Sequence, residues 1–179
     1  MVNGPIVVRE VNIDDLKHVS AATLVVNQAY RCEGGWTTEK EIVSGLRCTE
    51  QDMAYYMTHH GQPDILFFAF ENTDIVGTIK IQPVKDTNEA EIGLFAVSPF
   101  HQSRGIGGQL IRNSLLTMAK LGFETAVIQV LENRPDIIAW YRKLGFENLL
   151  GERIPFGWPE KSLVHDLHVL ILRKKLNLK

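Results

Sequence analysis

The sequence IGLFAVSPFHQSRGIGGQL, residues 92–110, decides the fold. An apolar run from Ile92 to Val97 is typical of a buried strand, and it enters a short polar turn that opens into an amphipathic helix. The first N–H groups of a helix have no partner inside it, and the aligned peptide dipoles make that end positive. Glycine allows the backbone to approach a ligand closely because it has no Cβ. The segment therefore predicts an anion site, for which phosphate is the usual ligand.

Length and composition predict a single soluble domain over residues 1–179. The chain is 45% hydrophobic and 22% charged with a formal net charge of −2, so we expect no nucleic-acid partner, which would need a basic face. Cys32 and Cys48 form no C-x-x-C pair, which argues against a disulfide framework and a structural zinc site. No run reaches about 18 apolar residues and no signal peptide is evident, so we expect no membrane partner and a cytoplasmic location.

Hydrophobic periodicity divides the chain into strands and helices. Apolar runs bounded by turn residues predict strands over Ile6–Val11, Ile65–Glu71, Ile75–Val84, Glu91–Val97, Ala126–Leu131, Phe146–Glu152 and Val164–Leu172. Helical spacing and capping signals predict helices over Asp14–Ala29, after Thr38, after Thr49, over Ile106–Leu121 and over Asn133–Leu144. The order β-α-α-β-β-β-α-β-α-β-β predicts a single-domain α/β fold, with a mixed, mostly antiparallel sheet of about seven strands flanked by about four helices.

Two common phosphate-binding motifs are not found in the glycine turn. The P-loop pattern G-x-x-x-x-G-K-[ST] does not occur, and the dinucleotide pattern G-x-G-x-x-G fails because Leu110 stands where the third glycine belongs. Residues 102–107, QSRGIG, instead match the pattern [QR]-x-x-G-x-[GA]. A second pattern, N-x(7)-Y-x(3)-G-F, occurs over residues 133–146. Two motifs in this order, each on the expected element, make a chance match improbable.

On these two motifs the chain resembles the GCN5-related N-acetyltransferase (GNAT) superfamily, whose hallmark loop grips the pyrophosphate of acetyl-CoA. The resemblance covers Ile6–Lys175 and includes the predicted order of elements. The segments Ala29–Arg31 and Gly35–Glu39 are similar to a subgroup of small, mostly uncharacterised microbial members. The resemblance implies the GNAT fold and acetyl-CoA as co-substrate.

The resemblance also assigns residues to the donor. The backbone of Phe95, Ala96 and Val97 is expected to pair with the pantetheine arm like an added strand, and the Phe95 N–H is expected to bind the oxyanion. Asn133 is expected to cap its helix and to contact the CoA arm. The pyrophosphate is expected to bind mostly backbone N–H groups of the turn, with Arg104 as a charge partner: Gln102, Ser103, Arg104, Gly105, Ile106, Gly107 and Gly108.

Two residues are candidates for catalysis. Tyr141 resembles the family tyrosine that protonates the departing sulfur, whereas periodicity alone makes it a core aromatic. Glu91 aligns with a glutamate that serves as general base in the histone-modifying branch, and its alternative is a solvent-facing strand residue paired with a lysine. Tyr30, Trp36 and Glu39 lie in the variable region that forms the acceptor pocket in the family.

The function that follows from the resemblance is transfer of an acetyl group from acetyl-CoA to the primary amine of a small-molecule or amino-acid-like acceptor, by direct attack in a ternary complex. Two alternatives remain open: acetylation of proteins or peptides, and a non-catalytic acyl-CoA-binding sensor. A homodimer is a further expectation from the family. His165, Asp166 and His168 suggest a metal site, but strand alternation places His165 on the opposite face, so no metal is expected.

Overall fold

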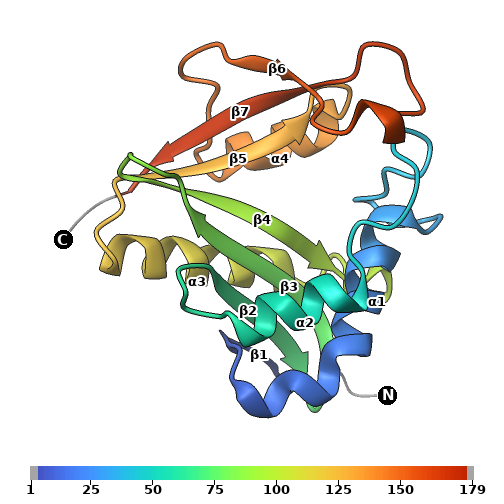
Figure 1. Ribbon diagram of the computed structural model, residues 1–179, viewed down its shortest axis with the longest axis vertical. Coiled ribbons are helices and arrows are strands. Elements are labelled where there is room, and N and C mark those ends of the chain that lie inside the picture. The colour runs from blue at the N-terminus through green and yellow to red at the C-terminus, as the bar shows by residue number, and fades with distance from the viewer. Residues whose placement is uncertain (1–3, 177–179) are drawn as a thin grey trace.

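A seven-stranded sheet forms the centre of this computed structural model, which describes residues 4–176 (Figure 1). Within those residues the strand order is β1-β2-β3-β4-β5-β7-β6, and neighbours are antiparallel except for β4 and β5. The strands are β1 Ile6–Glu10, β2 Ile65–Glu71, β3 Asp74–Pro83, β4 Glu89–Val97, β5 Thr125–Leu131, β6 Arg153–Pro155 and β7 His168–Lys175. The predicted mixed, mostly antiparallel sheet is confirmed.

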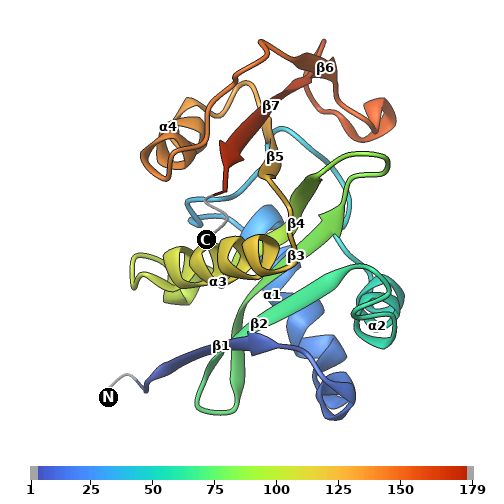
Figure 2. The same cartoon turned by 90° about the vertical axis from the view of Figure 1, so that its left-hand side faces the viewer.

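Helices cover both faces of the sheet (Figure 2). Their bounds are α1 Val19–Arg31, α2 Glu50–Thr58, α3 Ile106–Lys120 and α4 Pro135–Lys143. Val26 of α1 and Met53 of α2 join Phe68 of β2 in one apolar core. Leu110 of α3 and Ile138 of α4 belong to a second core on the other face. The order of strands and helices is the one that periodicity predicted.

The first predicted helix begins as a 3-10 helix, η1, over Ile13–His18, which leads directly into α1. Asn12 caps it, because its side chain accepts the N–H of Asp14 and its own N–H donates to the Asp15 carboxylate at 2.8 Å. Two further 3-10 helices span Pro99–His101 (η2) and Pro159–Lys161 (η3).

β4 and β5 separate along their length. They pair only over Glu89–Ile92 and Thr125–Ile128, so the remainder of β4 has no partner in β5, and Figure 1 shows the two strands diverging. A bulge bends β4 at this point: Leu94 has a φ of +46°, and its carbonyl accepts a hydrogen bond from the Thr78 hydroxyl at 2.7 Å. The sheet is thereby opened between its two central strands.

Four local predictions are wrong. The last strand, predicted over Val164–Leu172, starts only at His168 and runs to Lys175, because a bend and a turn precede it. The helix predicted after Thr38 is a single turn, because the chain becomes extended at Val43, which bridges Ser162. The strand predicted over residues 146–152 is limited to one bridge at Glu147, since a turn that ends at Gly151 (φ +66°) interrupts it and β6 starts only at Arg153. α4 is not capped by Asn133: its N-cap is Arg134, followed by Pro135 at the first helical position.

Candidate active site

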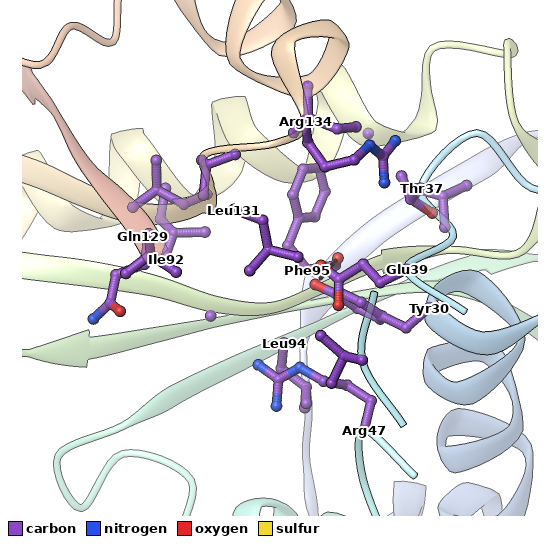
Figure 3. A pocket seen from close by; sticks show the side chains of 18 of the residues that line it. Tyr30, Thr37, Glu39, Arg47, Ile92, Leu94, Phe95, Gln129, Leu131 and Arg134 are labelled. Atoms are coloured by element: carbon purple, nitrogen blue, oxygen red, sulfur yellow. Dashed lines mark hydrogen bonds between the residues drawn. The ribbon is translucent and has the colours of Figure 1, made fainter. Parts of the chain in front are cut away.

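A cavity of about 720 Å³ lies where β4 and β5 diverge (Figure 3). Its walls come from those strands, α1, α4, the glycine turn, the 36–47 loop and the 154–161 segment. The cavity brings together residues that the sequence assigned to donor, acceptor and catalysis: Phe95, Val97, Gln102, Ser103, Gly105, Ile106, Gly107, Gly108, Tyr141, Tyr30, Trp36, Glu39 and Glu91. Three predicted site residues do not line it, namely Ala96, Arg104 and Asn133.

The glycine turn leaves the start of α3 open. Gly105, with a φ of +75°, is the N-cap of the helix, and no side chain caps the first turn. Ser103 also has a positive φ of +61°. A Cβ on Gly107 would lie 3.3 Å from Cζ of Phe95, so a side chain there would compete with the cavity wall. The turn is therefore a cradle of backbone N–H groups that suits an anion.

Side chains of the turn are used within the protein. The Gln102 amide donates to the Val97 carbonyl at 3.2 Å and accepts from the Trp36 N–H at 2.9 Å. Arg104 forms a double ion pair with Glu71, at 3.0 and 2.6 Å. The pairing explains why Arg104 points away from the cavity, where it was expected to meet a pyrophosphate. The backbone N–H groups of the turn are consequently the main groups that it offers to an anionic ligand.

The free part of β4 is fixed by contacts from both sides of the sheet. The Tyr30 hydroxyl, from α1, donates to the Phe95 carbonyl at 2.9 Å. The Phe95 ring stacks on Trp140 of α4, with centroids 5.9 Å apart. Ala96 is buried, so its side chain belongs to the core and only its backbone is available to a ligand.

Tyr141 lies between the core and the cavity. Its side chain is 6% exposed, packs edge-to-face on Trp140 and Phe146, and lines the cavity. Burial raises the pKa of the Tyr141 phenol well above its usual value, and the nearby Tyr30 and Glu39 raise it further. Tyr141 is therefore both a core aromatic, as periodicity predicts, and a residue of the cavity wall. Its phenol stays protonated at neutral pH.

Glu91 is half-buried at the cavity wall and not paired with a lysine. Its carboxylate accepts hydrogen bonds from the Gln129 amide at 3.2 and 3.3 Å, and among the described residues it has no cation within 4 Å. Burial raises the pKa of Glu91 above its usual range, an effect that the Gln129 hydrogen bond and the charges of Lys80 and Arg47 partly oppose. A carboxylate in this state is a stronger base than a solvated one.

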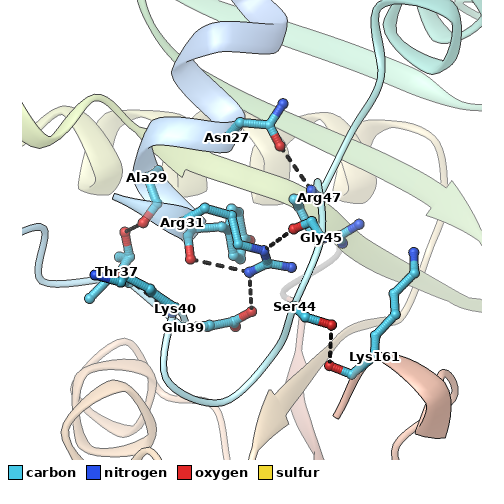
Figure 4. Close-up of polar contacts among 12 residues, drawn as sticks. Asn27, Ala29, Arg31, Thr37, Glu39, Lys40, Ser44, Gly45, Arg47 and Lys161 are labelled. Atoms are coloured by element: carbon cyan, nitrogen blue, oxygen red, sulfur yellow. Dashed lines mark hydrogen bonds and ion pairs between the residues drawn. The ribbon is translucent and has the colours of Figure 1, made fainter. Parts of the chain in front are cut away.

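The acceptor residues expected from the sequence, Tyr30, Trp36 and Glu39, all line the cavity, and Figure 3 shows Tyr30 and Glu39 side by side. Glu39 pairs with Arg31 at 3.2 Å, although burial raises the pKa of its carboxyl (Figure 4). Burial likewise raises the pKa of Tyr30. Trp36 is 44% exposed and meets Trp140 edge-to-face, so its ring borders the cavity mouth.

Sequence reasoning missed several cavity residues. Arg134 donates to the carbonyls of Trp36 and Thr38 at 2.6 and 2.7 Å and thereby ties the 36–38 loop to α4. Arg134 directly follows the motif residue Asn133, and this position could have marked it as a candidate. Asn133 itself is exposed and lies outside the cavity. Arg47 and Gln129 reach the cavity only through the folding of a loop and the pairing of β5, so no local pattern marks them.

Neither cysteine is placed for nucleophilic catalysis. Cys48 is buried outside the cavity lining, and burial raises its pKa to about 11, so the thiol is not ionised at neutral pH. Cys32 is exposed and also lies outside the lining. Over residues 4–176 there is no group of three or more His, Cys, Asp and Glu side chains that could hold a metal ion, and no helix is long and apolar enough to cross a membrane.

Comparisons with known proteins identify the family. The sequence model of the acetyltransferase (GNAT) family matches residues 35–146. The chain therefore belongs to the GNAT family of acetyltransferases and is an acyltransferase. A comparison with curated protein sequences gives no match.

Solved structures share the fold over nearly the whole chain. The ribosomal-protein-S18-alanine N-acetyltransferase of Escherichia coli aligns with a TM-score of 0.69 and 18% identity, covering 98% of this chain and 96% of that one. An N-acetyltransferase of Staphylococcus aureus Mu50 aligns at 0.71 and 16%, covering 98% and 100%. The protein yncA of Salmonella typhimurium, solved with its cofactor acetyl-CoA, aligns at 0.70 and 16%, covering 97% and 95%. At these identities the likeness concerns the fold.

Proposed function

We propose that this protein transfers the acetyl group of acetyl-CoA to the primary amine of a small-molecule or amino-acid-like acceptor, by direct attack in a ternary complex. The observation that carries the proposal is that one cavity joins the uncapped start of α3, the part of β4 that is not paired with β5, Glu91 and Tyr141. Direct attack is favoured because both cysteines lie outside the cavity and Cys48 is un-ionised at neutral pH.

The residues present suit acetyl-CoA. Phosphate oxygens need several N–H donors and space close to the backbone, and Gly105, Gly107 and Gly108 at the open end of α3 offer both. The amide groups of the pantetheine arm need an unpaired strand edge, which β4 offers beyond Ile92. In this assignment Phe95, Val97 and the turn hold the donor, which supplies an acetyl thioester.

Two protein groups then manage the protons. Glu91 takes a proton from the acceptor ammonium, so that the neutral amine can form the new C–N bond. Tyr141 gives its proton to the sulfur as the C–S bond breaks, because the phenol is still protonated at neutral pH. The nitrogen loses its second proton as the amide forms, and this proton restores the Tyr141 phenol while Glu91 releases its own proton to solvent. The raised pKa of Tyr141 keeps that proton in place, and the raised pKa of Glu91 makes it a better base. The Phe95 N–H is assigned to the developing oxyanion.

Release of free CoA tests the proposal. Purified protein and acetyl-CoA are mixed with a panel of amines, amino acids and peptides, and the thiol is followed with a chromogenic reagent. We expect thiol release above the hydrolysis background with at least one small amine. Binding of acetyl-CoA with no release for any acceptor would contradict the proposed transfer, and release with peptides alone would favour the protein-directed alternative.

Replacing Glu91 with Gln should remove the acidic limb of the pH–rate profile. The base works only when deprotonated, so activity rises as pH rises through the raised pKa of Glu91, and the limb should lie above the ordinary value of about 4.3. Glu91→Gln should also lower kcat by about 10²- to 10⁴-fold. The measurement is kcat across pH 5 to about 9 at saturating substrates.

A second variant sharpens this test. The Gln129 hydrogen bond lowers the pKa of Glu91, so Gln129→Leu should move the acidic limb to higher pH without removing it. Glu50→Gln, an exposed change at the start of α2, serves as the matched control and should leave the profile unchanged. An acidic limb that persists in Glu91→Gln would show that another group is the base.

A further inference from the structure

Arg47 is a cation of the cavity without a carboxylate partner among the described residues. Three arginines in that part of the chain have no carboxylate within 4 Å, Arg47, Arg112 and Arg142, and of these Arg47 alone lines the cavity. Figure 3 shows its guanidinium on the opposite side of Tyr30 and Glu39 from Arg134. A guanidinium that lines a cavity and has no ion-pair partner keeps N–H donors available to an anionic ligand.

The acidic residues of the cavity are each bonded elsewhere. Glu39 pairs with Arg31, Glu91 accepts from Gln129, and Asp52 accepts from Thr49 at the start of α2. Arg134 in turn pairs with Asp136 at 2.8 Å. The remaining cavity lysine, Lys161, lies against the ring of Trp158 at 5.9 Å, near the outer segment. Among the described residues, Arg47 and Lys161 are thus the lysine and arginine side chains of the cavity that have no ion pair, and Arg47 is the one that lies against Tyr30.

The fold holds the backbone at Arg47 in place (Figure 4). The Asn27 side chain of α1 accepts the backbone N–H groups of Arg47 and Cys48 at 2.8 and 3.3 Å, and donates to the Cys48 carbonyl at 2.7 Å. Arg31 fixes the preceding Gly45 carbonyl at 2.6 Å. The loop that carries Arg47 is therefore bonded to α1 through its backbone, which fixes the point from which the Arg47 side chain reaches the cavity.

Arg47 is also close to the place of acetyl transfer. Its guanidinium carbon lies 5.4 Å from the centroid of the Tyr30 ring, and the hydroxyl of the same ring donates to the Phe95 carbonyl on the free part of β4. One tyrosine side chain thus spans the distance between the free cation and the strand assigned to the thioester. This separation suits a short acceptor with an anionic group at one end and its amine at the other.

We propose that Arg47 binds the carboxylate of the acceptor, so that the acceptor is a free amino acid or a closely related amino-carboxylate. A guanidinium offers two parallel N–H donors that match a carboxylate. The carboxylate would neutralise Arg47 while the amine points toward Glu91 and Phe95. The inference rests on the proposed amine acetylation and narrows it to one substrate class. It also disfavours peptide N-termini, whose first residue has no free carboxylate.

The test compares each amino acid with its own carboxamide and methyl ester, using CoA release by the full-length protein. We expect kcat/KM for the free acids to exceed that for their neutral derivatives by about 10- to 100-fold, the value of one charge-assisted pair. Arg47→Gln should erase this preference by raising KM for the acids alone, and Arg47→Lys should restore part of it. Arg142→Gln, an exposed arginine change outside the cavity, should behave as wild type.

The outcomes separate this inference from the function on which it rests. Equal or better acetylation of esters, amides or peptide N-termini would overturn the role of Arg47 and leave amine acetylation intact. An Arg47→Gln defect of equal size for acids and esters would overturn it too. If no amine releases CoA, the proposed amine acetylation is wrong, and the carboxylate site is tested separately by calorimetric titration with N-acetyl amino acids. Binding to the wild type that is lost in Arg47→Gln supports the carboxylate site. No binding to the wild type, or equal binding to both proteins, refutes it.

Discussion

Tyr141→Phe should lower kcat by about 10²- to 10⁴-fold while the Kd for acetyl-CoA changes by less than about twofold. The substitution removes one hydroxyl and keeps the ring that packs on Trp140 and Phe146, so the core should remain intact. The loss should appear in turnover because the departing thiolate no longer receives a proton. Steady-state kinetics and calorimetric binding of acetyl-CoA measure the two quantities separately.

The matched control for this prediction is Tyr55→Phe. Tyr55 lies on α2, is 58% exposed and does not line the cavity, so the same chemical change there should leave kcat unaltered. Because burial raises the pKa of Tyr141, wild-type activity should show no basic limb from this residue below about pH 10. Unchanged turnover in Tyr141→Phe would remove the phenol from the mechanism.

Gly107→Trp should weaken acetyl-CoA binding by about 1000-fold or more. A Cβ at this position already meets Phe95 at 3.3 Å, so an indole has to extend into the cradle at the start of α3. Several charge-assisted hydrogen bonds, each worth about 10- to 100-fold in Kd, would be lost together. The measurement is calorimetric titration with acetyl-CoA, accompanied by thermal unfolding to verify that the variant folds.

Leu116→Trp provides the control on the same helix. Leu116 is 60% exposed on α3 and does not line the cavity, so the added indole should leave the Kd unaltered. A smaller change, Gly107→Ala, should weaken binding less, because its methyl group only touches the Phe95 ring. Normal affinity in folded Gly107→Trp would show that the phosphates bind elsewhere.

Much of the fold was accessible from the sequence because its signals are local. The glycine turn, the alternation in β4 and the stripe of α3 follow from residues close together in the chain. The predictions that failed have two causes: the segment after Thr38 becomes extended through the long-range bridge of Val43 to Ser162, and a turn that ends at Gly151 interrupts the strand predicted over residues 146–152. The capping pattern at Thr38 contains no information about the bridge that Val43 forms with Ser162.

The residues of the candidate site likewise fall into those that local motifs predict and those that only the fold brings to the cavity. Gly105, Gly107 and Tyr141 belong to two short motifs, and the structure places them in one cavity. Arg47 and Gln129 belong to no motif, since each acquires its position from α1 or from the pairing of β5. Arg104 shows the converse: it lies inside a motif, yet the ion pair with Glu71 directs it elsewhere. Charge pairing across the fold cannot be read from spacing along the chain.

The double anchoring of the 36–38 loop has a consequence for engineering this protein. Gln102 of the glycine turn binds Trp36 and Thr37, and Arg134, the N-cap of α4, binds the carbonyls of Trp36 and Thr38. A library that randomises this loop would therefore disturb the glycine turn and the start of α4 together with the cavity wall that the loop forms. Diversification aimed at a new acceptor belongs instead at the 43–47 and 154–161 segments, which line the same cavity. Substitutions in these two segments can change which acceptor binds without altering the residues that we assign to acetyl-CoA binding and proton transfer.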